Sequence, residues 1–491
     1  MTALKKLASG VGWGTASIIV NTIFQLFFMA IMARLLDPAD FGLIAIANVS
    51  LRFYSYFSQA GIAPALIQKK SLDEGDTSAA LAISLGISCF FYLIAYLASP
   101  WTEDYFEMQG LGLVMQVLAL NFIILGFSSI SQALLRRESR FKAISIIEII
   151  SYVLGYGVTG VIAAYLGAGV WSLVLAFMTQ STVTALLSYF VIRYPITFKH
   201  TKAQRKSLLG YGVRYSFIGF IEFLTSNLAP LVIGKLLGAS PAGFYSRAQL
   251  LAHLPVQHPT NILTRTLFPI MSSINDKNSK LLISFQLSSL IVGCYACAVG
   301  IGMHFAAADI VSVLLGDKWV EVVPLLKILS LSAVPLYMAH TASVTLDSMA
   351  QLKLSLRIQM AVLFLMVSLF VWFSSSLTLE NISYIILSMA FFRFILMYGS
   401  VIKLLNMAKK ELGLILIILM SIILSTALIM NLMLLMTAAI DLPIIRLLFD
   451  VIAGAMGLIV ALFFSRYFLR QLHSVDYLRN QLPVFDKIMA I

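Results

Sequence analysis

Long apolar runs alternate with short polar segments along almost the whole chain of 491 residues. A helix needs about 20 apolar residues to cross a bilayer. The runs are continuous and rich in Leu, Ile, Ala and Met, whereas strands of a membrane barrel would alternate polar and apolar positions over about ten residues. The pattern therefore predicts an all-α polytopic membrane protein with about 14 transmembrane helices. The predicted spans are 10–33, 41–66, 78–99, 111–134, 144–166, 169–192, 207–234, 242–271, 281–304, 322–348, 354–376, 382–403, 411–436 and 443–465.

Composition agrees with a lipid environment for most of the chain. Hydrophobic residues make up 60% of the sequence and charged residues only 11%, whereas ordinary soluble proteins carry about 25% charged residues. A soluble globular protein is excluded. The three cysteines, Cys89, Cys294 and Cys297, lie inside apolar runs, so the sequence predicts neither a disulfide framework nor a zinc site. The Cys294-x-x-Cys297 pair is interpreted as ordinary helix packing.

Basic residues explain the formal net charge of +12 without a nucleic-acid partner, because they lie in short groups between apolar runs. With Lys5 and Lys6 placed in the cytoplasm, twenty-four Lys and Arg fall on cytoplasmic segments. The opposite side holds three, namely Arg34, Lys235 and Lys318. Cytoplasmic loops retain basic residues, so this distribution predicts that both termini are cytoplasmic.

A weak internal repeat relates the two halves of the chain. The segment 33–42 resembles 234–244 at an offset of about 201, and six predicted spans separate the two copies. An even number of spans returns the chain to the same side, so the halves should form two parallel lobes around a central cavity, related by an axis along the membrane normal. The predicted organisation is an N-terminal lobe at 1–200, a C-terminal lobe at 201–406, two extra helices within 407–466, and a basic cytoplasmic tail at 467–491.

Ionisable residues within spans point to function, since each costs at least about 2.5 kcal/mol at the bilayer centre on insertion scales. In the second span Arg52 shares a helical face with Asn48 and Gln59. The eighth span, its repeat partner, contains Pro255 and Pro259, which permit bending. One face of that span carries Arg247, His258, Asn261 and Arg265.

Three further ionisable residues lie within predicted spans, Glu222 and Arg393 near the middle and Asp347 toward the cytoplasmic end. One interpretation is that all these groups form buried ion pairs that lock helices together. The alternative is a cationic cavity for an anionic headgroup, lined by arginines suited to bidentate phosphate contact. Four arginines against one mid-span glutamate leave an excess of positive charge, which favours the cavity formed by Arg52, Arg247, Arg265 and Arg393. Near the start of the last span, Arg446 is expected to pair with Asp450.

Motifs for several other chemistries are missing from the sequence. It contains no glycine-rich phosphate-binding loop ending in Gly-Lys-Ser or Gly-Lys-Thr, and no His-Glu-x-x-His. The loops are too short for a soluble catalytic domain. The sequence therefore predicts no enzyme, no metal site and no cofactor.

Several short motifs give the chain a family resemblance. They are Gly12-Trp13, Ala33-Arg34-Leu35-Leu36 with Phe41-Gly42, Gly61-Ile62-Ala63 to Gln68-Lys69-Lys70, Gln132-Ala133-Leu134 to Phe141-Lys142, and Thr264-Arg265-Thr266-Leu267-Phe268-Pro269. With these, the chain resembles the polysaccharide transporter family of the multidrug/oligosaccharidyl-lipid/polysaccharide flippases, close to the Wzx-type exporters. Arg265 lies within a matching motif, whereas Arg52, Arg247 and Arg393 do not.

The resemblance implies a flippase of the bacterial inner membrane that moves an undecaprenyl-pyrophosphate-linked oligosaccharide by alternating access, for O-antigen, capsule or exopolysaccharide synthesis. Its implied partners are this substrate, membrane lipids, a polysaccharide polymerase and a chain-length regulator. An ion gradient would drive transport, with Glu222 or Asp347 as the ion carrier. Alternatives are an ion-coupled drug or metabolite antiporter on the same fold, a membrane glycan polymerase or transferase, and a structural scaffold.

Overall fold

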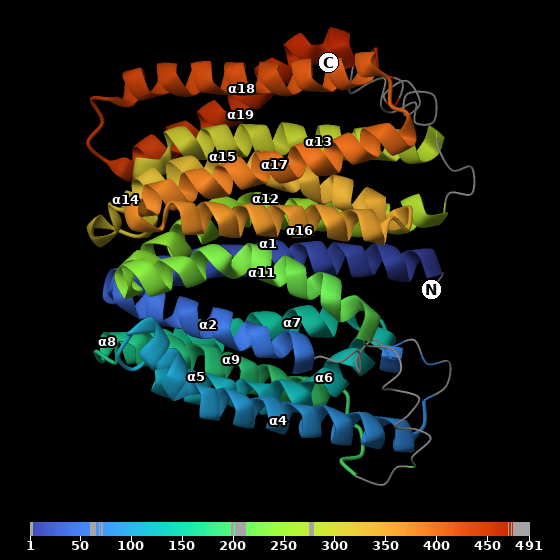
Figure 1. The fold of residues 1–491 in the computed structure, drawn as a ribbon, viewed down its shortest axis with the longest axis vertical. Helices are drawn as coiled ribbons and strands as arrows, with labels where there is room; N and C mark the ends of the chain where they lie inside the picture. Colours follow the sequence, from blue (N-terminus) through green and yellow to red (C-terminus); the bar gives the residue numbers. More distant parts are fainter. Residues whose placement is uncertain are drawn as a thin grey trace. The chain divides into compact units, whose positions relative to one another are not determined.

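The structure, a computed structural model, describes residues 3–58, 65–67, 69, 72–197, 201, 213–273, 279–469, 471–472 and 474. Of these, the side chains of 3–17, 55–58, 213–219, 262–273 and 279–280 are outside the description. Helices are the regular elements throughout the described part (Figure 1). The prediction of an all-α polytopic membrane protein is confirmed.

The chain divides into two compact units, Met1–Ser246 and Arg247–Ile491. In the first unit, α11 packs on α2 and α4, which places it with the helices that precede it in the sequence. The helices of this unit are α1 (Ala3–Leu35), α2 (Pro38–Ser58), α4 (Glu74–Phe106), α5 (Leu111–Ala119), α6 (Asn121–Arg137), α7 (Phe141–Tyr152), the π-helix η1 (Val153–Gly160), α8 (Val161–Tyr165), α9 (Val170–Val191), α11 (Val213–Leu237) and the start of α12 (Ala239–Ser273).

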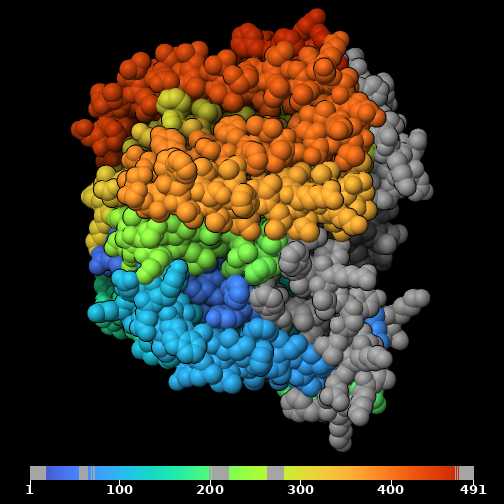
Figure 2. All heavy atoms as spheres, viewed as in Figure 1, coloured from blue at the N-terminus to red at the C-terminus, as the bar shows by residue number. Residues whose placement is uncertain are grey.

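The second unit continues α12 and adds the remaining helices. They are α13 (Ser279–Phe305), α14 (Ala307–Leu314), the 3-10 turn η2 (Asp317–Trp319), α15 (Val322–Ser348), α16 (Leu352–Trp372), the 3-10 turn η3 (Ser374–Ser376), α17 (Leu379–Leu405), α18 (Lys409–Thr437) and α19 (Pro443–Leu469). In Figure 1, α18 and α19 run alongside each other. Side chains fill the space between the ribbons of α16 and α17, as Figure 2 shows.

Twelve helical stretches of the described residues are long and apolar enough to cross a membrane. Three consecutive elements, α7, η1 and α8, form one of these stretches, as do α5 and α6 together. Each of the fourteen predicted spans coincides with a helix, but α2 and α12 are not among the twelve. These are the two helices in which the sequence predicts polar faces. The polar residues of α12 lower its hydropathy, whereas the side chains of α2 are described only over 38–54, a stretch too short to be counted. The protein is therefore a multi-pass membrane protein.

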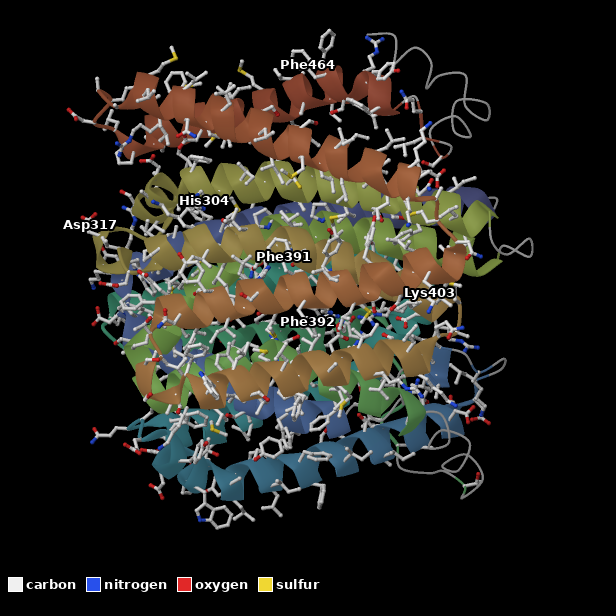
Figure 3. The ribbon with its side chains drawn as sticks, turned by 45° about the horizontal axis from the view of Figure 1, so that its top comes forward. His304, Asp317, Phe391, Phe392, Lys403 and Phe464 are labelled. Carbon is white, nitrogen blue, oxygen red and sulfur yellow. The ribbon has the colours of Figure 1, made fainter. Side chains whose placement is uncertain are left out.

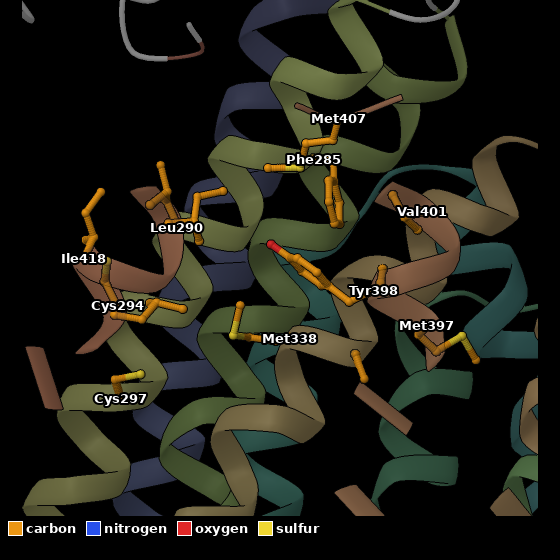
Figure 4. Packing of buried hydrophobic residues seen from close by; sticks show 14 of the residues in the cluster. Phe285, Leu290, Cys294, Cys297, Met338, Met397, Tyr398, Val401, Met407 and Ile418 are labelled. Atoms are coloured by element: carbon orange, nitrogen blue, oxygen red, sulfur yellow. The ribbon is translucent and has the colours of Figure 1, made fainter. Parts of the chain in front are cut away.

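Within the second unit, a large apolar cluster joins α13, α15, α17 and α18 (Figure 4). The ring of Tyr398 packs against Phe285 at 4.9 Å between centroids. Cys294 and Cys297 are both buried in this cluster and both are free thiols. Their interpretation as packing residues is confirmed. Large side chains on the outer faces, such as Trp101 and Trp372, are exposed, which suits helices that contact lipid rather than water.

Two local irregularities depart from a plain bundle. The fourth predicted span is broken at Leu120, between α5 and α6. The fifth contains the π-helix η1, in which Thr159 donates its hydroxyl hydrogen bond to the carbonyl of Leu154, five residues earlier. Short π-helical segments inside α-helices occur frequently at functional sites.

Candidate substrate-binding residues

Arg52 and Glu222 lie at the same level of the contact between α2 and α11. The ring of Phe53 on α2 contacts Phe220 at 5.7 Å and Phe223 at 6.4 Å, measured between centroids. Arg52 directly precedes Phe53, and Glu222 lies between the two phenylalanines of α11. Both charged side chains are exposed. The first unit therefore places, on two helices in contact, a predicted substrate-binding arginine and a predicted ion carrier that are 170 positions apart in the chain.

Two other residues, Asn48 and Gln59, belong to the predicted polar face of α2. Asn48, one turn before Arg52, is half-buried. Gln59 lies outside the described residues.

A pair of glycines brings the first turns of α2 and α12 into backbone contact. A Cβ atom added to Gly42 would lie 1.8 Å from the carbonyl oxygen of Ala239, and one added to Gly243 would lie 1.9 Å from that of Pro38. Gly42 and Gly243 are equivalent positions in the sequence repeat. All four residues belong to the first unit. No residue with a side chain fits at either glycine without moving the two helices apart.

A tyrosine hydroxyl replaces one backbone hydrogen bond that a proline removes from α12, and a second tyrosine contacts the same stretch of the helix. Pro259 has no N–H, so the carbonyl of Pro255, four residues earlier, lacks its usual helical donor. The hydroxyl of Tyr295 on α13 donates to that carbonyl at 3.1 Å. The hydroxyl of Tyr337 on α15 donates to the carbonyl of His253 at 3.4 Å. These two tyrosines, which the sequence did not single out, attach the proline-interrupted part of α12 to α13 and α15.

The predicted polar residues of α12 form an extended row rather than one compact site. Arg247 and His258 are eleven positions apart, which corresponds to about 16 Å along a helix. Arg247, His258 and Asn261 are all half-buried. The side chain of Arg265 lies outside the described residues, although its backbone is helical. A row of this length suits an elongated ligand better than a small ion.

Arg393 and Asp347 occupy different settings in the second unit. Arg393 is 9% exposed on α17, a helix that packs against α15 and α16. Asp347 is exposed in the last turn of α15. In Figure 3, Asp317 lies toward one end of this unit and Lys403 toward the other. Because Asp317 precedes α15, Asp347 lies at the opposite end of that helix from Asp317.

A network of charged residues at one end of the first unit was not predicted. Lys235 on α11 donates to Glu107 at 2.7 Å, and its ammonium group lies 5.1 Å from the centre of the Tyr105 ring. The hydrogen bond and the positive charge of Lys235 hold the pKa of Glu107 below its ordinary value. Glu103 accepts hydrogen bonds from the backbone N–H groups of Gly110 and Gly112. Lys235 and Glu107 are 128 positions apart, so no local pattern could reveal their contact.

The partner predicted for Arg446 is wrong. Its guanidinium pairs with Asp309 at 2.9 Å, and the carboxylate oxygens of Asp450 accept no hydrogen bond within the described part of the chain. The reason is the short helix α14, which packs on α19 and brings Asp309 to Arg446. The sequence predicted a loop between residues 304 and 322, and eight helical residues there are too few to show as a span.

The described residues contain no group of three or more His, Cys, Asp or Glu side chains that could hold a metal ion. The candidate site is thus a set of arginines, amides and one histidine on helices.

Comparisons with known proteins give the family of the chain and the likeness of its fold. A family model described as "Polysaccharide biosynthesis protein" matches residues 31–324. The lipopolysaccharide biosynthesis protein WzxC of Escherichia coli is 26% identical over 67% of this chain and 67% of its own length. The succinoglycan biosynthesis transport protein ExoT of Rhizobium meliloti is 26% identical over 67% of this chain and 66% of its own length. The fold is similar to that of the lipid II flippase MurJ in an inward closed conformation, with a TM-score of 0.69, 13% identity, and coverage of 93% of this chain and 98% of that one.

Proposed function

Because the chain belongs to the polysaccharide biosynthesis protein family, we propose that it is a flippase for a polyprenyl-pyrophosphate-linked oligosaccharide. Its relatives are named for the synthesis or transport of surface polysaccharides. The observation that carries the proposal is the polar character of α2 and α12, which remain helices among twelve apolar spans. Polar and charged groups at membrane depth are costly and mark substrate pathways.

The chemistry of the candidate residues suits a pyrophosphate attached to sugars. Arg52, Arg247, Arg265 and Arg393 would contact the pyrophosphate, since guanidinium groups bind phosphate oxygens in a bidentate manner. Asn48, Gln59, His258 and Asn261 would donate to and accept from sugar hydroxyls. The polyprenyl tail would stay in the bilayer throughout, so no free energy would be needed to move it into a polar cavity. The half-buried row along α12 extends over a length that an oligosaccharide headgroup could occupy.

Transport would proceed by alternating access between two lobes, residues 1–200 and 201–406, with the helices in 407–466 outside the repeat. Parallel repeats of this kind place the substrate site at their interface. In this scheme the protein resides in the bacterial inner membrane with both termini and the 467–491 tail in the cytoplasm, as the distribution of basic residues favours. Glu222, at the same level as Arg52, is the better placed of the two candidate ion carriers, and Asp347 is the other.

Glutamine substitutions test the arginines. Each variant, Arg52→Gln, Arg247→Gln, Arg265→Gln and Arg393→Gln, is expressed in a strain that lacks its own flippase, and surface polysaccharide is measured. Loss of one charged hydrogen bond costs about 1.5–3 kcal/mol, or roughly 10- to 150-fold in substrate affinity. Arg357→Gln, an exposed arginine on α16, is the control and should transport normally. Normal membrane insertion of every variant is checked by quantifying purified protein.

Full activity in all four variants would refute the proposal that these arginines line a substrate cavity. Two other measurements separate the alternatives. Purified protein that forms new glycosidic bonds would make it a polymerase or transferase, and gradient-driven efflux of small cations would make it an antiporter. Transport that persists after both the proton and sodium gradients are collapsed would exclude Glu222 and Asp347 as ion carriers. Co-purification with a polysaccharide polymerase or a chain-length regulator would identify the partners of the assembly.

A further inference from the structure

Three charged side chains meet near the start of α19, away from the residues assigned to the substrate. Arg446 pairs with Asp309 of α14 at 2.9 Å. Asp450 lies one helical turn after Arg446. Asp309 is 5% exposed and Asp450 is 3% exposed. Two buried carboxyl groups therefore share the neighbourhood of a single guanidinium.

Asp450 lacks the hydrogen bonds that a buried carboxylate requires. Neither of its oxygens has a partner among the described residues, and both are closed to solvent. A buried charge is costly unless it is paired, and the usual outcome is that the group becomes neutral. Arg446 already contacts Asp309, so ionisation of both carboxyl groups would leave one negative charge in excess.

Among the described side chains, the helices packed against α19 offer no second cation to Asp450. On α13, Tyr295 lines a cavity of about 320 Å³ beside Asp450, whose other walls are apolar side chains such as Met303, Leu447 and Val451. The ring of His304, also on α13, contacts the carbonyl of Lys327. The ionisable groups of α18 are Lys409, Lys410 and Glu411. They lie in the first turn of α18, at the opposite end of that helix from the turn into α19. On α14 the group that faces α19 is Asp309 itself.

We propose that Asp450 is a proton-binding site, and that its proton determines whether Arg446 links α19 to α14. With the proton bound, Asp450 is neutral and Arg446 contacts Asp309 alone. When the proton leaves, the Asp450 carboxylate, at the i+4 position from Arg446, competes for the same guanidinium. The link between α14 and α19 then weakens at the rim of the cavity. The site goes beyond the proposed transport function and does not depend on which substrate is moved.

Two measurements on the purified full chain test the site. The first is the infrared carbonyl band of a protonated carboxyl group, which should be present at neutral pH and absent from Asp450→Asn. The second is thermal unfolding from about pH 5 to about pH 9, where the unfolded chain releases the proton that the native protein retains. For one proton the unfolding equilibrium constant should rise by up to about tenfold per pH unit until Asp450 ionises. This rise should be missing from Asp450→Asn.

Matched variants keep the test decisive. Asp441→Asn changes an exposed carboxyl group just before α19 and should leave both the band and the pH dependence unchanged. In Asp309→Asn, Arg446 is released to pair with Asp450, so the carboxyl band should disappear although Asp450 is intact. This variant also decides the matter if Asp450→Asn does not fold. A band that persists in either variant, or that is absent from the unmodified protein, would overturn the proposal.

Discussion

The contact between Gly42 and Gly243 makes a quantitative prediction for alanine substitutions. Real Cβ atoms essentially never approach another heavy atom closer than 3.0 Å, and a Cβ at Gly243 would lie 1.9 Å from the Pro38 carbonyl oxygen. The first turns of α2 and α12 would have to separate by at least 1.1 Å in Gly243→Ala, and by 1.2 Å in Gly42→Ala. Both obstacles are backbone atoms, so no side-chain rotation relieves them.

The expected free-energy penalty follows from other overpacked sites, where extra atoms cost about 1–3 kcal/mol. A penalty of about 2 kcal/mol would reduce the population of the state with the helices in contact by roughly thirtyfold relative to a state with them apart. Separation is detected by the rate at which a cysteine replacing Ala239 reacts with a membrane-impermeant maleimide, in a chain whose three native cysteines are replaced by serine. Surface polysaccharide in a flippase-deficient strain gives the functional readout.

Gly86→Ala is the matched control, because a Cβ at Gly86 has no neighbour within 4 Å and the residue belongs to the same unit. Both glycine variants should show faster labelling of position 239 and reduced transport, and Gly86→Ala should show neither. If Gly42→Ala and Gly243→Ala label and transport like the control, the close backbone contact does not exist and the reasoning fails.

Three further predictions concern contacts in the two units. Tyr295→Phe should destabilise the protein by about 1–3 kcal/mol in thermal unfolding, because it leaves the Pro255 carbonyl without a donor. Tyr384→Phe, at an exposed position, is the control and should have no effect. Equal stability of the two variants would show that water donates to the Pro255 carbonyl instead. Lys235 lowers the pKa of Glu107 from its ordinary value of 4.5, so this contact should stabilise the fold above that value and be lost as pH falls through the lowered pKa. Lys235→Met should lack that acid-dependent loss, and an unchanged acid unfolding profile would contradict the assignment. Cys297, with no exposed surface, should resist a maleimide in the folded protein and react after denaturation; rapid labelling of Cys297 in the folded protein would show that the α13 core opens.

The positions of the helices could be predicted from the sequence because each apolar run has to satisfy its own backbone hydrogen bonds in lipid. That constraint is local, and a helix lies at every predicted span. It does not fix the irregularities. The break at Leu120 and the π-helix at 153–160 depend on how neighbouring helices pack, and both occur inside continuous apolar runs.

The candidate site could be predicted only as far as single helices allow. Helical spacing makes Asn48, Arg52, His258 and Asn261 candidates, because positions on one face of a helix are local information. Spacing along one helix cannot predict contacts between helices. The pairing of Arg446 with Asp309 instead of Asp450 is an example. Pro259 removes the helical donor of the Pro255 carbonyl, but which hydroxyl replaces that donor depends on the placement of α13.

The polar residues of α2 and α12 also bear on how the chain enters the membrane during synthesis. A nascent helix leaves the translocation channel for lipid when its own transfer free energy is favourable, and charged residues at its centre oppose this. If α2 and α12 cross the bilayer, each has to leave the channel together with an adjacent apolar helix, α1 or α4 for the former and α11 or α13 for the latter. Insertion and tertiary packing of these helices are then a single event, so a substitution that weakens the contact between α2 and α11 would reduce the yield of inserted protein before any transport is measured.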